Sequence, residues 1–443
     1  MSDRRDFLKQ GLLAGGFLGL QRALGARVRP EGRLCRGYGP LVKDAAGILD
    51  LPEGFSYRVI SRRGTKMTDG FLVPGQPDGM AAFAGKSGRI ILVRNHELGV
   101  ETNAWGAIPH ARKYPEDISC YDAGAESEFV MPGGTTHLIY NPKTEEVEKE
   151  YLSLVGTNRN CAGGKTPWGT WITCEEPEFL TEGRGRMHGW CFEVKADSEG
   201  VQEAIPMKGL GRFRHEAIAV DPRSKVIFLT EDRHDGLFYR FVPSKEEKDG
   251  KLQALALEGI SDSRNWSSAD FKEGQRVKAK WVDLEDIEAP KDDLRFRGAQ
   301  AGATVFARGE GCWWGEEGKV WFCCTNGGRR RRGQLFSFQP EGEGGELELF
   351  LEPRKSDLLT NGDNLTIARN GDLIIAEDRE NEVCSLRGVT SKGQIYTLAK
   401  NRLNSSELAG VCFSPDNGIL FVNIQNPGLT LAIKGDWSAR KSD

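Results

Sequence analysis

A unit of two apolar strands joined by a turn recurs six times in this chain and constrains its fold more than any other feature. In each copy an acidic residue or a cysteine opens the first strand, and the second strand ends in Glu, Asn or Gln. The copies begin at Asp78, Cys161, Glu216, Glu310, Asp363 and Glu407. Internal repeats of this size are typical of solenoids and propellers.

Further strand-like runs follow most of these pairs, bounded by Gly or Pro and alternating apolar with polar residues. Predicted third strands start at Thr136, Gly189, Gly236, Gly333 and Gly393, and predicted fourth strands cover 145–154 and 346–353. Four antiparallel strands make one blade of a β-propeller. We therefore predict an all-β, six-bladed β-propeller with helical or loop insertions, the two longest near 98–131 and 244–299.

The N-terminus has the features of an export signal. Arg4 and Arg5 precede Phe7 and Leu8, and a short Gly-rich apolar stretch follows. This pattern resembles a twin-arginine signal and is too short to span a bilayer stably. We predict a signal peptide over 1–26, a single domain over 27–443, and export by the twin-arginine machinery to the periplasm or the extracellular space. No later segment is predicted to be transmembrane.

Charge and cysteine content exclude several functions. The formal net charge of -4 gives no basic field for nucleic acid, and we interpret the run from Arg329 to Arg332 as a solvated loop. The ten cysteines show neither a dense disulfide spacing nor a CxxC zinc pair. Four of them, Cys174, Cys312, Cys323 and Cys412, lie inside apolar strands, so we interpret most of the cysteines as small core residues.

The acidic residues recur at matching positions of the units. Glu97, Glu176, Glu231 and Glu377 each close an apolar second strand, and Asn326 and Gln425 stand there in the other two copies. In a propeller, matching positions face the same end of the central channel. Packed carboxylates repel one another unless cations neutralise them, so the pattern predicts bound metal. The alternative is that these acids are turn residues facing water.

The ligand types indicate which metals fit. Carboxylates and amides suit a hard cation such as calcium, and Cys161 adds a soft ligand that indicates a transition metal; otherwise Cys161 is a buried core thiol. His96 and His215 each precede a candidate ligand by one residue, so we expect them on the opposite strand face, packing there or supporting the ligands; direct metal ligation is the alternative. Arg308, two residues before Glu310, is a candidate phosphate clamp or a partner of a neighbouring acid.

At these motifs the chain resembles the PhoX alkaline phosphatases, a family of twin-arginine-exported phosphatases. The resemblance covers roughly Pro52 to Trp437 and is carried by RNHE, NRNCAGGKTPWGTWITCEE, GRFRHEAIAVDP, TEDRHDGLFYRF, RGEGCWW, CTNGG, DNLTIARNGDLIIAEDRE and SPDNGILFVNIQNPG. It implies a six-bladed propeller with a mixed iron and calcium cluster that hydrolyses phosphate esters at alkaline pH. The chain is shorter than many members, which puts the lid segments and the substrate range in doubt.

The resemblance also implies residue roles. Cys161 matches an iron-binding cysteine, and within RGEG Glu310 matches a metal ligand and Arg308 a phosphate-binding arginine. The remaining implied metal ligands are Glu97, Glu175, Glu176, Glu216, Glu231, Asp363 and Glu377.

Together these observations predict an alkaline phosphatase-type hydrolase of phosphate monoesters. Fe³⁺ and Ca²⁺ would stabilise the transition-state charge, with a metal-bound oxo or hydroxo group as nucleophile. Small phosphate esters are the predicted partners. Two alternatives stay open on the sequence alone: a calcium-binding propeller scaffold without catalysis, and a lactonase or phosphodiesterase that uses the same site.

Overall fold

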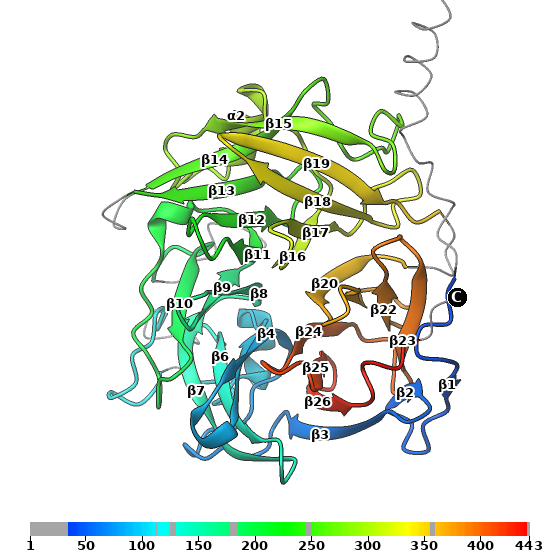
Figure 1. Ribbon diagram of the computed structural model, residues 1–443. Helices are drawn as coiled ribbons and strands as arrows, with labels where there is room; N and C mark the ends of the chain where they lie inside the picture. The colour runs from blue at the N-terminus through cyan, green and yellow to red at the C-terminus, as the bar shows by residue number, and fades with distance from the viewer. Residues whose placement is uncertain are drawn as a thin grey trace, which may run out of the picture.

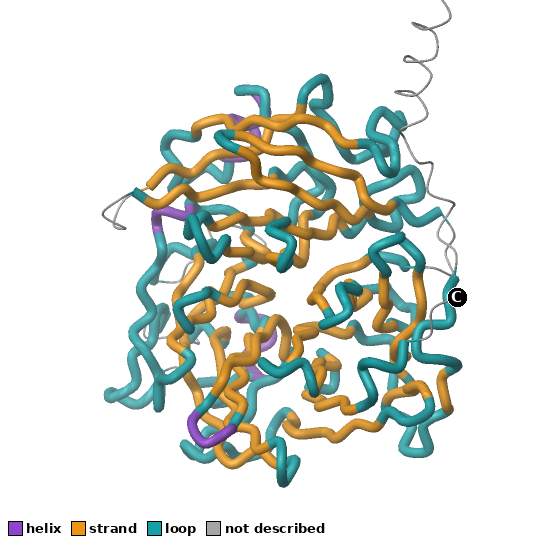
Figure 2. The backbone as a smooth tube through the Cα atoms, in the orientation of Figure 1, coloured by secondary structure: helices purple, strands orange, loops and turns teal. Residues whose placement is uncertain are grey.

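The computed structural model describes residues 34–111, 113–124, 130–177, 185–244, 250–354 and 359–440. The predicted signal peptide over 1–26 lies outside these residues. Strands dominate the described chain (Figures 1 and 2). Its helices are short: α2 (Leu294–Gln300) and the 3₁₀ turns η1 (Lys86–Gly88), η2 (Val100–Trp105) and η3 (Lys208–Leu210). No helix among the described residues is both long and apolar enough to cross a membrane.

The strands group by the repeated unit. The first unit contains β4 (Pro77–Ala84), β5 (Ile90–His96), β6 (Gly133–Asn141) and β7 (Glu146–Thr157). The second contains β8 (Asn160–Lys165), β9 (Thr170–Glu175) and β10 (Cys191–Lys195). The third contains β11 (His215–Val220), β12 (Ile227–Glu231), β13 (Phe238–Pro243) and β14 (Gly250–Leu257), and β15 (Arg276–Asp283) follows it.

The later units repeat this plan. The fourth contains β16 (Gly309–Trp314), β17 (Val320–Cys324), β18 (Gln334–Glu341) and β19 (Gly344–Leu351). The fifth contains β20 (Gly362–Ile367), β21 (Leu373–Glu377), β22 (Ser385–Val389) and β23 (Ile395–Asn401). The sixth contains β24 (Leu408–Phe413), β25 (Ile419–Ile424) and β26 (Leu429–Lys434). Three strands precede the units: β1 (Leu41–Val42), β2 (Leu49–Pro52) and β3 (Ser56–Arg62).

These strands pair into five antiparallel sheets among the described residues. The third and fourth units share a nine-stranded sheet because β15 pairs with β19. The chain start joins the chain end: β3 is the fourth strand of the sixth unit, beside β26, and β2 pairs with β23 of the fifth. The first strands thereby join the sheets formed by the end of the chain, and β3 becomes the outer strand of the sixth unit.

The first strand of every unit lies at the centre of the molecule. β4, β8, β11, β16, β20 and β24 contact one another in this order and return to β4, while later strands lie outside (Figure 1). The predicted all-β class is thus confirmed as a mainly-β, propeller-like fold.

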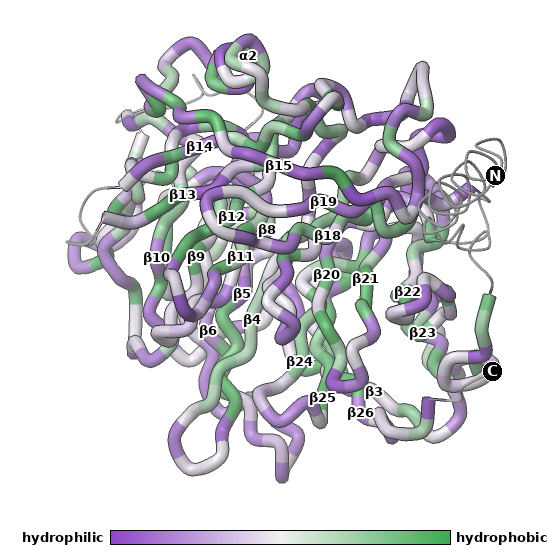
Figure 3. Tube along the Cα trace, turned by 45° about the horizontal axis from the view of Figure 1, so that its top comes forward, coloured by the Kyte–Doolittle hydropathy of each residue, from purple (hydrophilic) through white to green (hydrophobic). Residues whose placement is uncertain are grey.

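Apolar side chains fill the space between neighbouring units. Between the third and fourth units, Phe238 stacks on Phe322 with ring centroids 4.3 Å apart, and Phe322 stacks on Phe336 at 5.1 Å. All three rings are buried. The hydropathy colouring shows apolar stretches along the central strands and polar ones along many loops (Figure 3). This burial is the main term that holds neighbouring units together.

Two predictions need correction. The run from Gly393 is β23, the fourth strand of its unit, because β22 precedes it. The charged segment 244–299 contains two strands, β14 and β15, besides most of α2. β15 alternates exposed charged residues with buried Val277 and Ala279, which is the pattern of a half-buried strand.

A bulge interrupts each central strand where it nears its neighbours. In the first five units two residues of the first strand face one residue of the second, and the acid or cysteine that opens the unit is the first of the two. A Cβ on Gly79 would lie 2.5 Å from the Cα of Ala162, and one on Gly311 2.5 Å from the carbonyl oxygen of Asp363. Glycine therefore lets these central strands approach closely.

Candidate metal centre

One backbone hydrogen bond recurs in every unit and defines equivalent positions. The residue just after the second strand donates its N–H to a carbonyl near the start of the first strand. We call the donors exit residues; they are Glu97, Glu176, Asp232, Thr325, Asp378 and Gln425. We call the acceptors rim residues; they are Gln76, Arg159, Arg214, Arg308, Asn361 and Glu407.

Two residues after the rim residue comes the inner residue, which opens the central strand. The inner residues are Asp78, Cys161, Glu216, Glu310, Asp363 and Ala409. Five of these were predicted from the repeat. The prediction for the sixth unit is wrong, because the amide of Gln425 bonds the carbonyl of Glu407 and so makes Glu407 a rim residue.

The exit residues correct a second prediction. The sequence pattern placed Glu231 and Glu377 beside Glu97 and Glu176, but both are the last residues of their strands. The equivalent exit residues are Asp232 and Asp378, one residue later. Likewise Thr325, not Asn326, is the exit residue of the fourth unit. Successive residues of an extended chain face opposite sides, so this single step moves a side chain away from the centre.

Glu175, Glu231 and Glu377 end their strands facing the loops, and we call them clamp residues. Glu175 accepts hydrogen bonds from the amides of Asn158 at 2.9 Å, Gly189 at 2.8 Å and Trp190 at 3.1 Å. His188 adds a contact at 2.7 Å. These carboxylates are buried, contrary to the alternative of water-facing turn residues. The donors around Glu175 satisfy both of its oxygens without a cation.

Glu377 behaves in the same way, whereas Glu231 keeps one buried oxygen, Oε1, without a hydrogen-bond partner among the described residues. Glu231 accepts from the amide of Leu237 and from the Tyr239 hydroxyl, 3.1 and 2.7 Å away. Glu377 accepts from the amides of Thr360 and Ser385, both at 3.1 Å, and from Arg387 at 2.9 Å. Clamp residues therefore order the loops that flank the second strands.

The inner, exit and rim side chains instead converge on one another. Three groups each bring one ligand atom per residue within 4.8 Å of the others. They are Cys161–Glu176–Glu216, Glu216–Glu310–Asp363 and Asp78–Glu97–Glu407. The first two groups share Glu216. We refer to these residues together with Asp232 and Asp378 as the acidic cluster.

Burial and mutual repulsion raise most pKa values in the acidic cluster. The pKa rises well above its usual range for Asp78, Glu176, Glu216, Glu310, Asp363 and Glu407. The main cause is burial, and neighbouring carboxylates add to it. Asp232 is the exception: although burial raises its pKa, Arg308 and Arg214 hold it below the ordinary value. The protein's own cations therefore stabilise only part of this negative charge.

Three rim residues in consecutive units are arginines. Arg308 binds Asp232 through two nitrogens, Nε at 2.7 Å and Nη2 at 2.9 Å, and Nη2 also lies 2.9 Å from Glu310. Arg214 contacts Glu176 at 2.6 Å and Asp232 at 3.4 Å. Arg159 lies 3.9 Å from Glu97. Only Arg308 was predicted, although Arg159-Asn160-Cys161 and Arg214-His215-Glu216 repeat the spacing of Arg308-Gly309-Glu310.

Cys161 and the two histidines complete the surroundings. The Cys161 thiol is buried, and burial raises its pKa well above the ordinary value, with Glu216 and Glu176 adding to the effect. His96 bonds the carbonyl of Gly75 and the Thr136 hydroxyl, 2.8 and 2.9 Å away, which fits the predicted packing role. His215 also faces away from the acidic cluster, toward Gly211.

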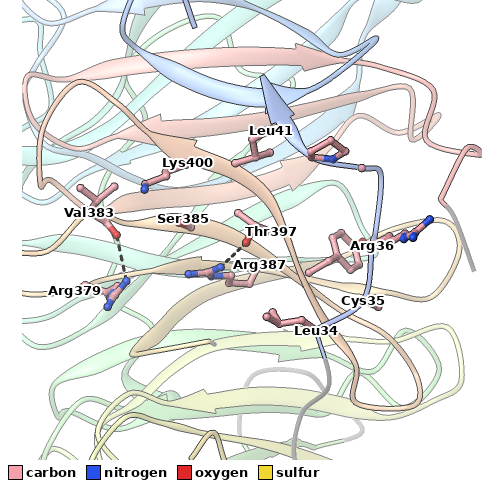
Figure 4. A pocket seen from close by; sticks show the side chains of 13 residues that line it. Leu34, Cys35, Arg36, Leu41, Arg379, Val383, Ser385, Arg387, Thr397 and Lys400 are labelled. Carbon is pink, nitrogen blue, oxygen red and sulfur yellow. Dashed lines mark hydrogen bonds between the residues drawn. The ribbon is translucent and has the colours of Figure 1, made fainter. Parts of the chain in front are cut away.

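A separate pocket of about 700 Å³ lies beside β22 and β23 and is closed on one side by the segment from Leu34 to Leu41 (Figure 4). Its basic lining residues are Arg36, Arg379, Arg387 and Lys400. Arg387 is held by Glu377 at 2.9 Å. None of the acidic cluster lines this pocket, so it belongs to the outer strands of the fifth unit.

The fold is propeller-like, and the family comparison identifies the class of protein as a metal-dependent hydrolase. Residues 36–428 match the family model described as alkaline phosphatase PhoX, and the chain belongs to this family of phosphoric monoester hydrolases. The predicted family and enzyme class are thereby confirmed.

Among solved structures, Pseudomonas fluorescens PhoX in complex with vanadate, a transition state analogue, is similar with a TM-score of 0.65 and 17% identity. The match covers 93% of this chain and 98% of that chain, so the fold extends over nearly the whole molecule. A gluconolactonase of Xanthomonas campestris matches with a TM-score of 0.42 and 12% identity over 92% of this chain and 98% of that chain. No curated protein matches the chain.

Proposed function

We propose that the six units form six blades around the acidic cluster, and that this cluster binds calcium and iron ions and hydrolyses phosphate monoesters. The observation that carries the proposal is the joint placement of two opposite features. Carboxylates that lack enough positive charge meet the guanidinium groups of the rim. Cation sites beside arginines are what a phosphoryl group requires.

The donor set fits metal ions. Nine carboxyl groups of the acidic cluster face only three rim arginines among the described residues, and most of those carboxyl groups have raised pKa values. Cations would replace the protons and remove the repulsion. Since Glu216 belongs to two groups, its carboxylate is suited to bridge two ions.

The ligand types divide the sites between the two metals. Cys161, Glu176 and Glu216 offer a thiolate with carboxylates, which favours a transition ion such as Fe³⁺. The other two groups offer oxygen alone, which favours Ca²⁺. Glu175, Glu231 and Glu377, expected as ligands from the sequence, are assigned to loop clamping instead, because they accept hydrogen bonds from backbone amides or neighbouring side chains; in Glu231 only Oε2 does so.

When bound, the ions would supply positive charge to phosphoryl oxygens and lower the pKa of a water molecule that attacks phosphorus. The chain supplies orientation. Arg308 is fixed through Nε and Nη2, and among the described residues Nη1 has no hydrogen bond, so its two N–H groups are available to a phosphate oxygen. A donor already held in place costs no reorganisation during the reaction.

Export is part of the proposal. The segment 1–26 would direct the folded domain 27–443 through the twin-arginine machinery to the periplasm or the extracellular space, where small phosphate esters are the substrates. Loading of iron and calcium before export suits a route that carries folded protein.

The test is hydrolysis of p-nitrophenyl phosphate by purified chain loaded with calcium and iron. We expect release of p-nitrophenol at alkaline pH and its loss after chelation. Bis(p-nitrophenyl) phosphate and an aliphatic lactone are the comparison substrates, and faster turnover of either would replace the monoesterase assignment. If the protein contained calcium but no iron, and the metal-replete protein hydrolysed none of these substrates, the chain would instead be a binding scaffold without catalysis.

A further inference from the structure

A second set of metal-ligand side chains lies outside the acidic cluster. Cys174 on β9 and Cys191 on β10 stand directly opposite each other, and their sulfur atoms are 3.6 Å apart. A ring nitrogen of His215, on β11 of the next unit, lies within 4.8 Å of both sulfurs. All three residues are fully buried. The group therefore joins two strands of the second unit to the central strand of the third.

The distance between the sulfurs separates two kinds of chemistry. A disulfide requires about 2.05 Å between sulfur atoms. Two thiolates on a tetrahedral ion, each about 2.3 Å from the metal, stand about 3.8 Å apart. The observed 3.6 Å is near the second value, and all ten cysteines of the chain are free.

The imidazole of His215 is oriented as in a metal site. Its Nε2 lies 3.1 Å from the carbonyl oxygen of Gly211, while Nδ1 is buried and has no hydrogen-bond partner among the described residues. Its ring stacks on Phe213 at a centroid distance of 3.6 Å. Histidine ligands commonly donate one ring N–H to a backbone carbonyl and bind metal through the other nitrogen. A buried nitrogen without a partner is otherwise costly.

We propose that Cys174, Cys191 and His215 bind one thiophilic divalent ion of the zinc type, separate from the ions of the acidic cluster. Two thiolates with one imidazole are a zinc-type ligand set, and three protein ligands leave the fourth position to another group. The ion stabilises the structure around the active centre: it ties β9 to β11 one residue from the inner residue Glu216. The proposal stands independently of the phosphatase activity.

The Cys161→Ser variant of the full chain tests this site without interference from the thiol of the acidic cluster. After removal of metal and addition of Co²⁺, we expect a thiolate-to-cobalt charge-transfer band with one equivalent bound. The band should disappear in Cys161→Ser/Cys191→Ala. It should remain in Cys161→Ser/Cys412→Ala, the matched control, because Cys412 is another buried strand cysteine outside this group.

Measurements on the unaltered chain test the site without depending on the folding of a variant. Elemental analysis should give one zinc-type ion per chain, and X-ray absorption at that metal's edge should show two sulfur neighbours and one nitrogen neighbour. A Cys174–Cys191 disulfide in non-reducing peptide mass spectrometry, no zinc-type ion in the native chain, or an unchanged cobalt band in the Cys191 variant would each overturn the proposal. Absence of phosphatase activity would leave these readouts untouched.

Discussion

Clamp and exit residues are neighbours in the chain, yet they stand in opposite environments. Glu175 and Glu377 accept hydrogen bonds from backbone amides and side-chain donors. One residue later, Glu176 and Asp378 lie beside other carboxylates that repel them. Both residues at each step are acidic; Glu175, Glu176 and Glu377 are buried, and Asp378 is half-buried. What differs is the strand face, because consecutive side chains point in opposite directions. The supply of N–H donors therefore distinguishes a structural acid from a ligand for cations.

This difference predicts opposite responses to neutralisation. Removing a charge from a clamp residue leaves amides without a strong acceptor and should destabilise the fold. Removing a charge from the acidic cluster relieves repulsion in metal-free protein but deletes a ligand. Neutralising a clamp residue should therefore mainly lower stability, whereas neutralising a residue of the acidic cluster should mainly lower activity.

The largest expected effect is that of Glu216→Gln, since Glu216 is shared by two groups of the acidic cluster. We expect kcat/KM to fall by about 10³-fold or more, the rate equivalent of about 4 kcal/mol. The metal-free variant should unfold at higher denaturant than metal-free wild type, because a buried like charge is gone. Metal content, turnover and urea unfolding measure the three quantities.

Glu377→Gln is the matched control with the same chemical change. It should retain the metal content of wild type and lose about 1–3 kcal/mol of stability, because Thr360, Ser385 and Arg387 lose a charged acceptor. If the two variants lost metal to the same degree, the division between clamp and cluster would be wrong.

The next effect concerns His188, which lies between two carboxylates in the clamp region. It contacts Glu175 at 2.7 Å and Asp122 at 3.0 Å, and it is fully buried. Although burial lowers the pKa of His188, Glu175 and Asp122 raise it to about 9. Tyr121 packs edge-on at 5.5 Å, with Arg186 over its ring. A folded pKa above the unfolded value of about 6.5 gives stability that is present below pH 6.5 and lost as pH rises through 9.

We therefore expect His188→Asn to cost about 3 kcal/mol of unfolding free energy near pH 6, with the difference from wild type shrinking toward pH 10. Urea unfolding at fixed metal content across this range is the measurement. A difference that stays constant with pH would show that His188 acts by packing alone.

Individual residues show which positions of the site the sequence could predict. Asp78, Cys161, Glu216, Glu310 and Asp363 were placed correctly because each opens an apolar strand after the same spacing. Glu407 was wrongly assigned to the inner position, because the sequence alone does not distinguish an acid at that position from an acid two residues before it. Only the bond from the Gln425 amide to the Glu407 carbonyl shows the register. At Glu231 and Glu377 the next residue, Asp232 or Asp378, is also acidic, so the sequence alone does not show which of the two is the exit residue.

The fold shows the same limit. Apolar first and second strands were recognised in every unit, since their residues are buried on both faces. β15 was hidden because its exposed face carries charge, and its partner β19 comes from the next unit. The arginine spacing at Arg159 and Arg214 was readable in the sequence, but it gains meaning only when the three rim residues lie in consecutive units.

The smallest effect we predict is that of Arg308→Lys. Lysine keeps the charge but loses the planar fork that binds Asp232 through two nitrogens while Nη1 remains available. Loss of one charged hydrogen bond to substrate should lower kcat/KM by about 10- to 30-fold, or about 1.5–2 kcal/mol, with metal content unchanged. Arg331→Lys, on an exposed turn away from the acidic cluster, is the matched control and should keep wild-type turnover. Equal loss in both variants, or loss of metal in Arg308→Lys, would mean that the rim arginine supports the ion ligands and does not bind phosphate.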